Sequence, residues 1–266
     1  MNVIIILAAI LFILMKLIGK EKGVKSFFSL LINFFILYVA IILIAHNLNS
    51  IFITLLACFL ISYITLFYIN GISTKTIAAF LSTIVTLIAL YLFIYLIGTI
   101  TRIQGFGEEE FEEISIYSLY IGIDFTQVVI STIIIGLIGA IIDTAISISS
   151  SMNEVFLHNQ SITRHNLFES GLNISRDILG TTTNTLYFAF VGGYMALILW
   201  LKDLNYSFGK IINSKIFCSE IISILCSGLG VALIIPITAG ITSYLLTSRR
   251  GRESMNSLTK NASHEE

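Results

Sequence analysis

Residues 126–154 read TQVVISTIIIGLIGAIIDTAISISSSMNE, an apolar run that carries one aspartate followed by four serines. The apolar part is long enough to cross a membrane, because about 20 residues at 1.5 Å each span a hydrocarbon core of roughly 30 Å. Six further runs share this character, at about 2–19, 27–45, 50–70, 76–100, 180–201 and 220–247. Together the runs predict an all-α integral membrane protein with about seven transmembrane helices.

The composition of the chain excludes an ordinary soluble domain. Of 266 residues, 56% are hydrophobic and only 12% are charged, whereas soluble domains carry about 25% charged residues. The chain therefore lacks the polar surface that would coat a globule. A transmembrane β-barrel is disfavoured as well, because its short alternating strands are not seen in the pattern.

The distribution of Lys and Arg predicts the orientation in the membrane, because inner loops carry an excess of these residues. With the N-terminus outside, the inner segments hold eleven of them and the outer segments hold four. We therefore expect the N-terminus out and the C-terminus in. The expected organisation is a four-helix hydrophobic scaffold (1–100), an acidic extracytoplasmic segment (101–125), a three-helix core (126–248) with a cytoplasmic loop at 151–179, and a polar cytoplasmic tail (249–266).

The polar residues of 126–154 share one helical face. At 100° per residue, the following lie within about 40° of Asp143: Gly136, Gly139, Ser147, Ser150 and Glu154. Glycines let another helix approach closely, while an aspartate at the bilayer centre costs at least about 2.5–3.5 kcal/mol. We expect the face to meet protein or a water-filled cavity. Asp143 is then either a structural residue bonded to hydroxyls or backbone, or a site on an ion, proton or solute path.

A second polar face opens the run that begins near residue 180. Asp177, Thr181 and Asn184 are spaced by four and three residues, and the neighbouring Arg176 is a cation available to pair with Asp143, Glu154 or Asp177. This pattern is compatible with a gate or ion pair at the inner mouth of a path. It is also compatible with an interfacial Arg–Asp pair followed by ordinary helical threonines.

The last run contains a ridge of small residues around the only proline of the chain. Its members, spaced by four, are Gly228, Ala232, Pro236 and Gly240. The spacing predicts close helix packing, and a proline inside a helix frees a carbonyl and bends the axis. Pro236 is therefore a hinge, an ion-ligating break or a packing bend.

The acidic segment has two interpretations. Five glutamates lie between 108 and 113. Carboxylates of this kind either begin a helix, where they complement its dipole, or form a vestibule that attracts cations.

No enzymatic, metal or cofactor site is predicted. Aspartyl chemistry requires a pair of carboxylates, and only Asp143 lies clearly within a span. Ser149, Ser150 and Ser151 have no histidine in the membrane to activate them. The three cysteines and four histidines show no metal-ligand spacing.

Four stretches of the chain resemble the YibE/F family of prokaryotic membrane proteins. They are GFGEEE (105–110), IGAIIDTAISISSSMNE (138–154), LFESGLNISRDILGTTTNTLYFAFVGG (167–193) and SEIISILCSGLGVALIIPIT (219–238), within a resemblance over about 105–240. The resemblance implies a multi-pass protein of the bacterial cytoplasmic membrane and points to Asp143, Arg176, Asp177 and Asn184. Because family members look to be encoded in pairs, it also implies a paired family member as partner.

Two functions follow from these observations. The first is a permease or channel-like transport component with a polar path between the last three membrane helices. The alternative is a non-transporting membrane subunit that docks a paired family member through the same small and polar faces. The expected surroundings are the lipid bilayer and either that relative or a second copy of the chain, and no nucleic acid.

Overall fold

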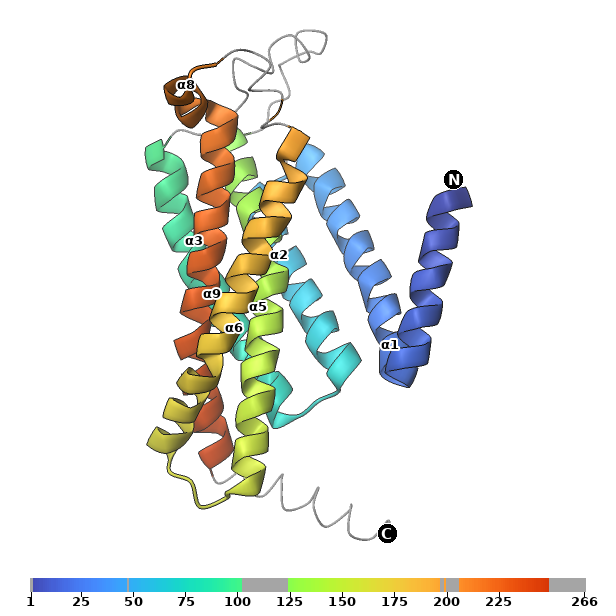
Figure 1. Cartoon of the computed structure of the whole chain (residues 1–266), viewed down its shortest axis with the longest axis vertical. Helices are drawn as coiled ribbons and strands as arrows, with labels where there is room; N and C mark the ends of the chain where they lie inside the picture. The colour runs from blue at the N-terminus through green and yellow to red at the C-terminus, as the bar shows by residue number, and fades with distance from the viewer. Residues whose placement is uncertain (1, 47, 102–123, 197–198, 200–205, 249–266) are drawn as a thin grey trace.

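The computed structural model describes residues 2–46, 48–101, 124–196, 199 and 206–248, and the secondary structure within these ranges is helical. The elements are α1 (Asn2–Ala45), α2 (Ser50–Tyr63), the π-helix η1 (Ile64–Tyr68), α3 (Thr74–Thr101), α5 (Phe125–His158), α6 (Arg164–Gly193), α8 (Phe208–Asn213) and α9 (Lys215–Thr247). In Figure 1, α3, α5, α6 and α9 stand side by side as a bundle. Helix α2 packs beside this bundle, and α1 forms a V-shaped hairpin at its edge.

Within the described ranges, five helical segments are long and apolar enough to cross a membrane. They are Val3–Ala45, Ser50–Tyr68, Thr74–Thr101, Phe125–His158 and Lys215–Thr247. The described part of the chain is thus all-helical and has the composition of a membrane protein, as the sequence predicts. The count of seven spans and the orientation remain predictions.

Two of the seven predicted runs, 2–19 and 27–45, lie within α1. The helix bends at Lys20, whose φ of 49° is not helical, and the two arms fold back on each other (Figure 1). A Cβ on Gly23 would overlap the carbonyl oxygen of Met15, so the bend requires a glycine where the arms meet. The rings of Phe12 and Phe27 pack edge to face across it, with centroids 5.0 Å apart.

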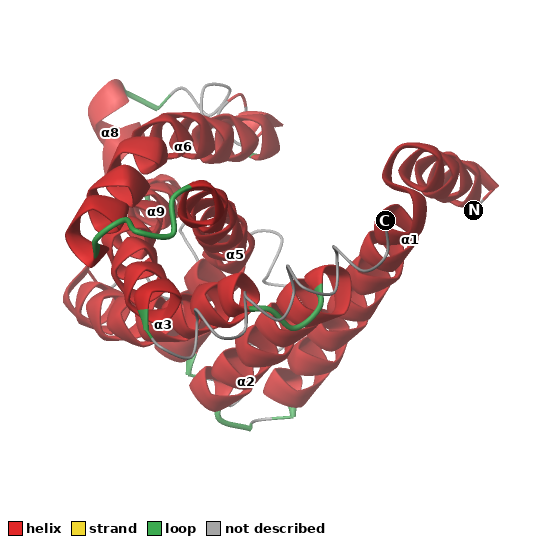
Figure 2. Cartoon of the chain, turned by 90° about the horizontal axis from the view of Figure 1, so that it is seen from below, coloured by secondary structure: helices red, strands yellow, loops and turns green. Residues whose placement is uncertain are grey.

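Residues 180–193 of the run predicted at 180–201 belong to α6, which is not among the five apolar segments. Figures 1 and 2 show α6 running alongside α5 and α9 along much of their length. Helix α6 has 30 residues, so its length does not exclude it from the set. Residues 197–198 and 200–201 of this run lie outside the described residues.

The prediction of a cytoplasmic loop at 151–179 needs correction, because nearly all of this stretch is helical in the structure. Helix α5 continues to His158 and α6 begins at Arg164, which leaves only 159–163 as a connection. The Thr163 hydroxyl accepts a hydrogen bond from the backbone N–H of Asn166 (3.3 Å) and caps α6. The physical reason is burial: Met152, Phe156 and Leu167 form one hydrophobic cluster with residues of α9.

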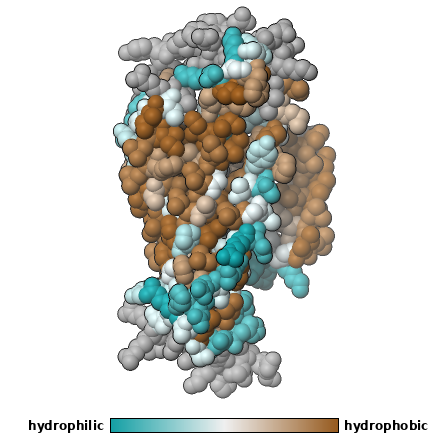
Figure 3. Space-filling model, turned by 60° about the vertical axis from the view of Figure 1, so that its left-hand side comes forward, coloured by the Kyte–Doolittle hydropathy of each residue, from teal (hydrophilic) through white to brown (hydrophobic). Residues whose placement is uncertain are grey.

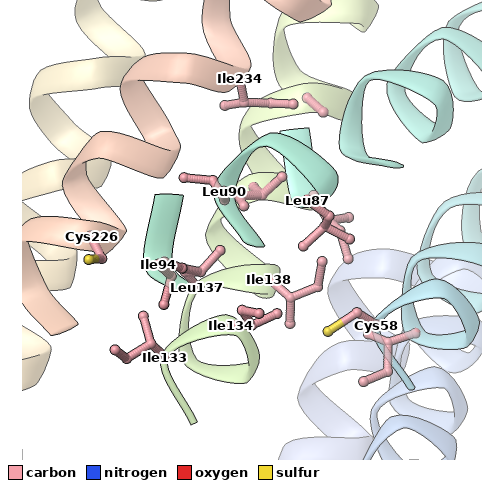
Figure 4. Packing of buried hydrophobic residues seen from close by; sticks show 14 of the residues in the cluster. Cys58, Leu87, Leu90, Ile94, Ile133, Ile134, Leu137, Ile138, Cys226 and Ile234 are labelled. Atoms are coloured by element: carbon pink, nitrogen blue, oxygen red, sulfur yellow. The ribbon is translucent and has the colours of Figure 1, made fainter. Parts of the chain in front are cut away.

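The largest hydrophobic core lies where α3, α5 and α9 meet (Figure 4). A Cβ on Gly230 of α9 would lie 3.1 Å from Cδ1 of Leu90 on α3, so these helices approach closely. The same cluster takes in Cys58 and Ile61 of α2. Helices from the predicted scaffold (1–100) and the predicted core (126–248) therefore share one hydrophobic cluster. Most of the acidic segment and all of the tail lie outside the described residues.

Candidate functional site

Helix α5 positions the first set of candidate residues. It begins where the Asp124 carboxylate accepts a hydrogen bond from the backbone N–H of Thr126 (2.9 Å). Its 34 residues give a length of about 50 Å at 1.5 Å per residue, more than a hydrocarbon core of roughly 30 Å. The helix can therefore cross the layer and still extend beyond it.

The face predicted around Asp143 points away from the bundle. Asp143 is exposed, and so are Gly136, Gly139, Ser147 and Glu154. Ser150 is half-buried. The opposite side of α5 is packed: Leu137, Ile141 and Ile148 are fully buried. We call the six outward residues the α5 stripe.

The glycines of the α5 stripe make no close contact inside the described chain. Nothing lies within 4 Å of a Cβ placed on Gly136 or Gly139. The tightly packed glycines of the bundle are instead Gly98, Gly171 and Gly230. No spacing rule in the sequence distinguished these three, because the side chains that each of them meets lie on other helices.

Helix α6 carries the second set on its outer side. Arg176, Asp177, Thr181 and Asn184 are all exposed, and so is Gly180. We call these five residues the α6 face. Figure 3 shows a hydrophilic stripe that runs through the hydrophobic band of the molecule, above a hydrophilic lower end.

Contacts at three glycines show which side of α6 faces the bundle. A Cβ on Gly171 would lie 2.6 Å from the sulfur of Met152 on α5. On α9, a Cβ on Gly228 would lie 3.9 Å from Thr183, and one on Gly240 would lie 4.0 Å from Phe168. The α6 face lies on the other side of the helix from these contacts, and its five residues are exposed in the described part of the chain.

The predicted pairing of Arg176 with an acidic residue is not present in the described part of the chain. The one ion pair found there joins His165 Nε2 to Glu169 Oε1 at 3.6 Å, both exposed on α6. Asp143 and Asn184 likewise have no hydrogen-bond or ionic partner among the described residues. The Thr181 hydroxyl is satisfied locally, because it donates to the Asp177 carbonyl (3.0 Å).

The predicted ridge on α9 is divided between two environments. Gly228 and Gly240 are half-buried against α6, whereas Ala232 and Pro236 are exposed. Helix α9 runs from Lys215 to Thr247 as one element, with Pro236 inside it.

Two contacts that the sequence did not suggest join α6 to α9 at their ends. The Arg164 guanidinium lies 4.8 Å from the centre of the Tyr244 ring. At the other end, the Tyr194 hydroxyl and the Glu220 carboxylate are close enough to interact electrostatically. Both pairs join residues distant in sequence, so no local pattern could have indicated them.

The chemistry available on the outer surface is that of carboxylates, hydroxyls, an amide and one guanidinium. Within the described ranges, no group of three or more His, Cys, Asp or Glu residues is placed to hold a metal ion. Such a surface can hold a cation, a proton or a polar solute, or it can hydrogen-bond another helix.

Long apolar helices around a shared core define a polytopic helical membrane protein. A sequence profile of the YibE/F-like protein family matches residues 7–248, and the chain belongs to this family. The match confirms the resemblance drawn from residues 105–240 and extends it over the N-terminal helices. No curated protein and no solved structure matches the chain.

Proposed function

We propose that this protein is a permease or channel-like transport component of the bacterial cytoplasmic membrane, whose polar path follows the α5 stripe and the α6 face. The observation that supports this proposal is the exposure of Asp143 on a helix that is otherwise apolar at that depth. A charged side chain facing lipid there costs at least about 2.5–3.5 kcal/mol. Water along the surface removes that cost.

The proposed path runs along the outside of the bundle and not between α5, α6 and α9. The space between α5 and α9 is filled by apolar side chains, including Leu137 and Ile141 against Gly230. A path on an outer surface has only one wall in a single chain, so the transport component acts as part of an assembly.

Each group has a definite role in this proposal. The Asp143 carboxylate binds a cation or a proton within the membrane. Ser147, Ser150 and Glu154 continue the polar surface toward the inner end of α5, and Arg176 and Asp177 of α6 act as a gate at about the depth of Ser147. No catalytic step is assigned to the protein.

Transport by purified protein in proteoliposomes tests the role of Asp143. We expect Asp143→Asn to abolish the flux of the transported ion or solute, in a panel that includes protons, monovalent cations and small polar solutes. The matched control is Ser149→Ala, which changes a buried residue on the same helix whose hydroxyl donates to the Ile146 carbonyl. Flux that is equal in Asp143→Asn and wild type across the panel would contradict the proposal.

Water access to the α5 stripe is a separate test. In a background without Cys58, Cys218 and Cys226, we expect a cysteine at Ser147 to react with a charged, membrane-impermeant thiol reagent. A cysteine at Ser149 should remain unreacted, because this position is fully buried. An unreactive Ser147→Cys would indicate a dry helix contact.

The alternative function is a non-transporting membrane subunit that docks a paired family member through the same surface. The open space over Gly136 and Gly139 supports it, because small residues at an interface let helices approach closely. Co-purification with a related membrane protein, together with an unreactive cysteine at position 147, is the result expected from this alternative. A purified monomer that transports would exclude it.

A further inference from the structure

The uncovered surface pairs a hydrogen-bond acceptor on one helix with a donor on the next. We propose that a second copy of this chain covers its outer part in a two-fold arrangement, with α6 of each copy packed on Gly136, Gly139 and Asp143 of the other. In this arrangement the Asn184 amide of each copy donates a hydrogen bond to the Asp143 carboxylate of its partner. The proposal rests on the proposed function in that Ser147, Ser150 and Glu154, inward of this contact, remain the wall of the path, but it can be tested without measuring transport.

The contact between Gly171 and Met152 sets the relative depth of the two helices. Because α5 and α6 are antiparallel (Figure 1), equal numbers of residues counted from this contact toward the outer side reach equal depth. Gly180 lies nine residues after Gly171, and Asp143 lies nine residues before Met152. Asp143 and Gly180 are thus at the same depth.

The same count places two further pairs. Asn184 lies thirteen residues after Gly171, and Gly139 lies thirteen residues before Met152. One turn farther out on α6 stands Phe188, which is exposed, and its depth agrees with that of Gly136 to within one residue. Asp143, Asn184 and Phe188 are therefore each at the depth of a glycine on the other helix.

A two-fold axis along the membrane normal keeps depth unchanged from one copy to the other. In such a dimer Asp143 faces Gly180 of the partner copy, while Asn184 and Phe188 face the partner's two stripe glycines. These glycines have open space around them: nothing lies within 4 Å of a Cβ on Gly136, Gly139 or Gly180. The two surfaces therefore fit by size, with small residues opposite large ones.

The side-chain directions then bring the polar groups together. The Cα–Cβ bonds of a helix tilt toward its N-terminus, so Asp143 leans outward along α5 and Asn184 leans inward along α6. The two residues are one helical turn apart in depth, about 6 Å, and each leans toward the other. A carboxylate accepts and an amide donates, which makes the surface complementary to itself.

Self-complementarity is the reason for choosing a second copy as the occupant. One chain supplies both the donor and the acceptor, and both the large and the small residues, at matched depths. In Figure 2, no described helix covers α5 on the side between α6 and the first arm of α1. The partner's α6 occupies that side.

Disulfide cross-linking between two differently tagged copies tests the arrangement. In a background without the three native cysteines, one copy carries Gly136→Cys and the other carries Phe188→Cys, which leaves Asp143 and Asn184 intact. We expect a covalent dimer that contains both tags. The matched control replaces Gly136→Cys with Leu92→Cys, which is 59% exposed on α3 at a similar depth but lies on another side of the bundle. It should give no dimer.

A second measurement isolates the proposed hydrogen bond. The bond occurs twice in each dimer, so we expect Asn184→Ala to weaken dimerisation in nanodiscs or bicelles roughly tenfold. Asp143→Ala should have a similar effect, and the double variant should be no weaker than either single one. These losses are expected whether or not the protein transports a solute.

Three results would overturn the dimer. The first is equal cross-linking in the Leu92 control, and the second is a monomeric wild-type protein at all concentrations tested. The third is cross-linking only to a different membrane protein, which would identify a paired relative as the occupant. Loss of transport in Asp143→Asn with the cross-link retained would leave both proposals in place. A retained cross-link with no transport by wild type would overturn the proposed function alone.

Discussion

Gly171 of α6 lies directly against Met152 of α5: a Cβ added at the glycine would come 2.6 Å from the methionine sulfur and 3.2 Å from Cβ of Ala239 on α9. This one point fixes α6 between α5 and α9. It also sets the depth at which the polar residues of α6 stand relative to Asp143.

Gly171→Ala should destabilise the protein. The added methyl group overpacks the junction of α5, α6 and α9, at a cost of about 1–3 kcal/mol, measured as a fall in the thermal unfolding temperature in detergent. The control is Gly192→Ala, also on α6, where nothing lies within 4 Å of a Cβ. That change should be neutral or stabilising by up to about 1 kcal/mol, because alanine favours helix over glycine. Equal effects at both positions would contradict this prediction.

Gly23→Ala should open the hairpin of α1. The new methyl group cannot coexist with the carbonyl oxygen of Met15, so the arms must separate and the Phe12–Phe27 contact is lost. Spin labels on Leu7 and Phe35, both exposed, should move apart in a pulsed electron paramagnetic resonance measurement. Gly19→Ala is the matched control, because no atom lies within 4 Å of its Cβ. An unchanged distance in Gly23→Ala would show that the bend does not depend on this contact.

Tyr244→Leu should loosen the lower end of α6. The variant removes the ring that lies under the Arg164 guanidinium, an interaction worth about 0.5–1 kcal/mol at an exposed site. Hydrogen exchange should become faster in the first turns of α6, and the same result is expected for Arg164→Ala. Tyr244→Phe retains the ring and should behave like wild type, whereas faster exchange in this variant would exclude the cation–π contact.

The orientation predicts which turns can be labelled from outside the cell. A cysteine at His46, after α1, should react with an impermeant reagent on intact cells. A cysteine at Ser161, in the turn between α5 and α6, should react only after permeabilisation. Both positions are exposed, so access to the reagent depends on the side of the membrane alone. The reverse pattern would place the N-terminus inside.

The existence of most helices could be predicted from hydropathy, and their limits could not. The runs at 50–70, 76–100, 126–150 and 220–247 correspond to α2 with η1, α3, α5 and α9. The stretch 151–179 reads as a loop because its polarity excludes it from the lipid interior. A polar stretch can still form a helix. Phe156 and Leu167 are buried in a hydrophobic cluster with residues of α9, and these residues are too distant in sequence for a local pattern to reveal the cluster.

For the candidate site, periodicity predicted which residues stand together on one helix but not which helices meet. The sequence offered Arg176 as an ionic partner for Asp143, yet the two do not pair in the described chain. Whether a helical face points into the bundle depends on how much apolar surface the other faces of that helix can bury instead. Comparing these buried areas requires the positions of all the helices.

The sequence alone determined that the chain belongs in a membrane, and that Asp143 shares one face with two glycines, two serines and a glutamate. The 3.6-residue period of the helix is sufficient for that. Only the tertiary structure decided that this face points outward. The isoleucine- and leucine-rich sides of α5 bury more apolar surface and make more packing contacts against α3 and α9, so they occupy the core and the polar stripe is left for another molecule to meet.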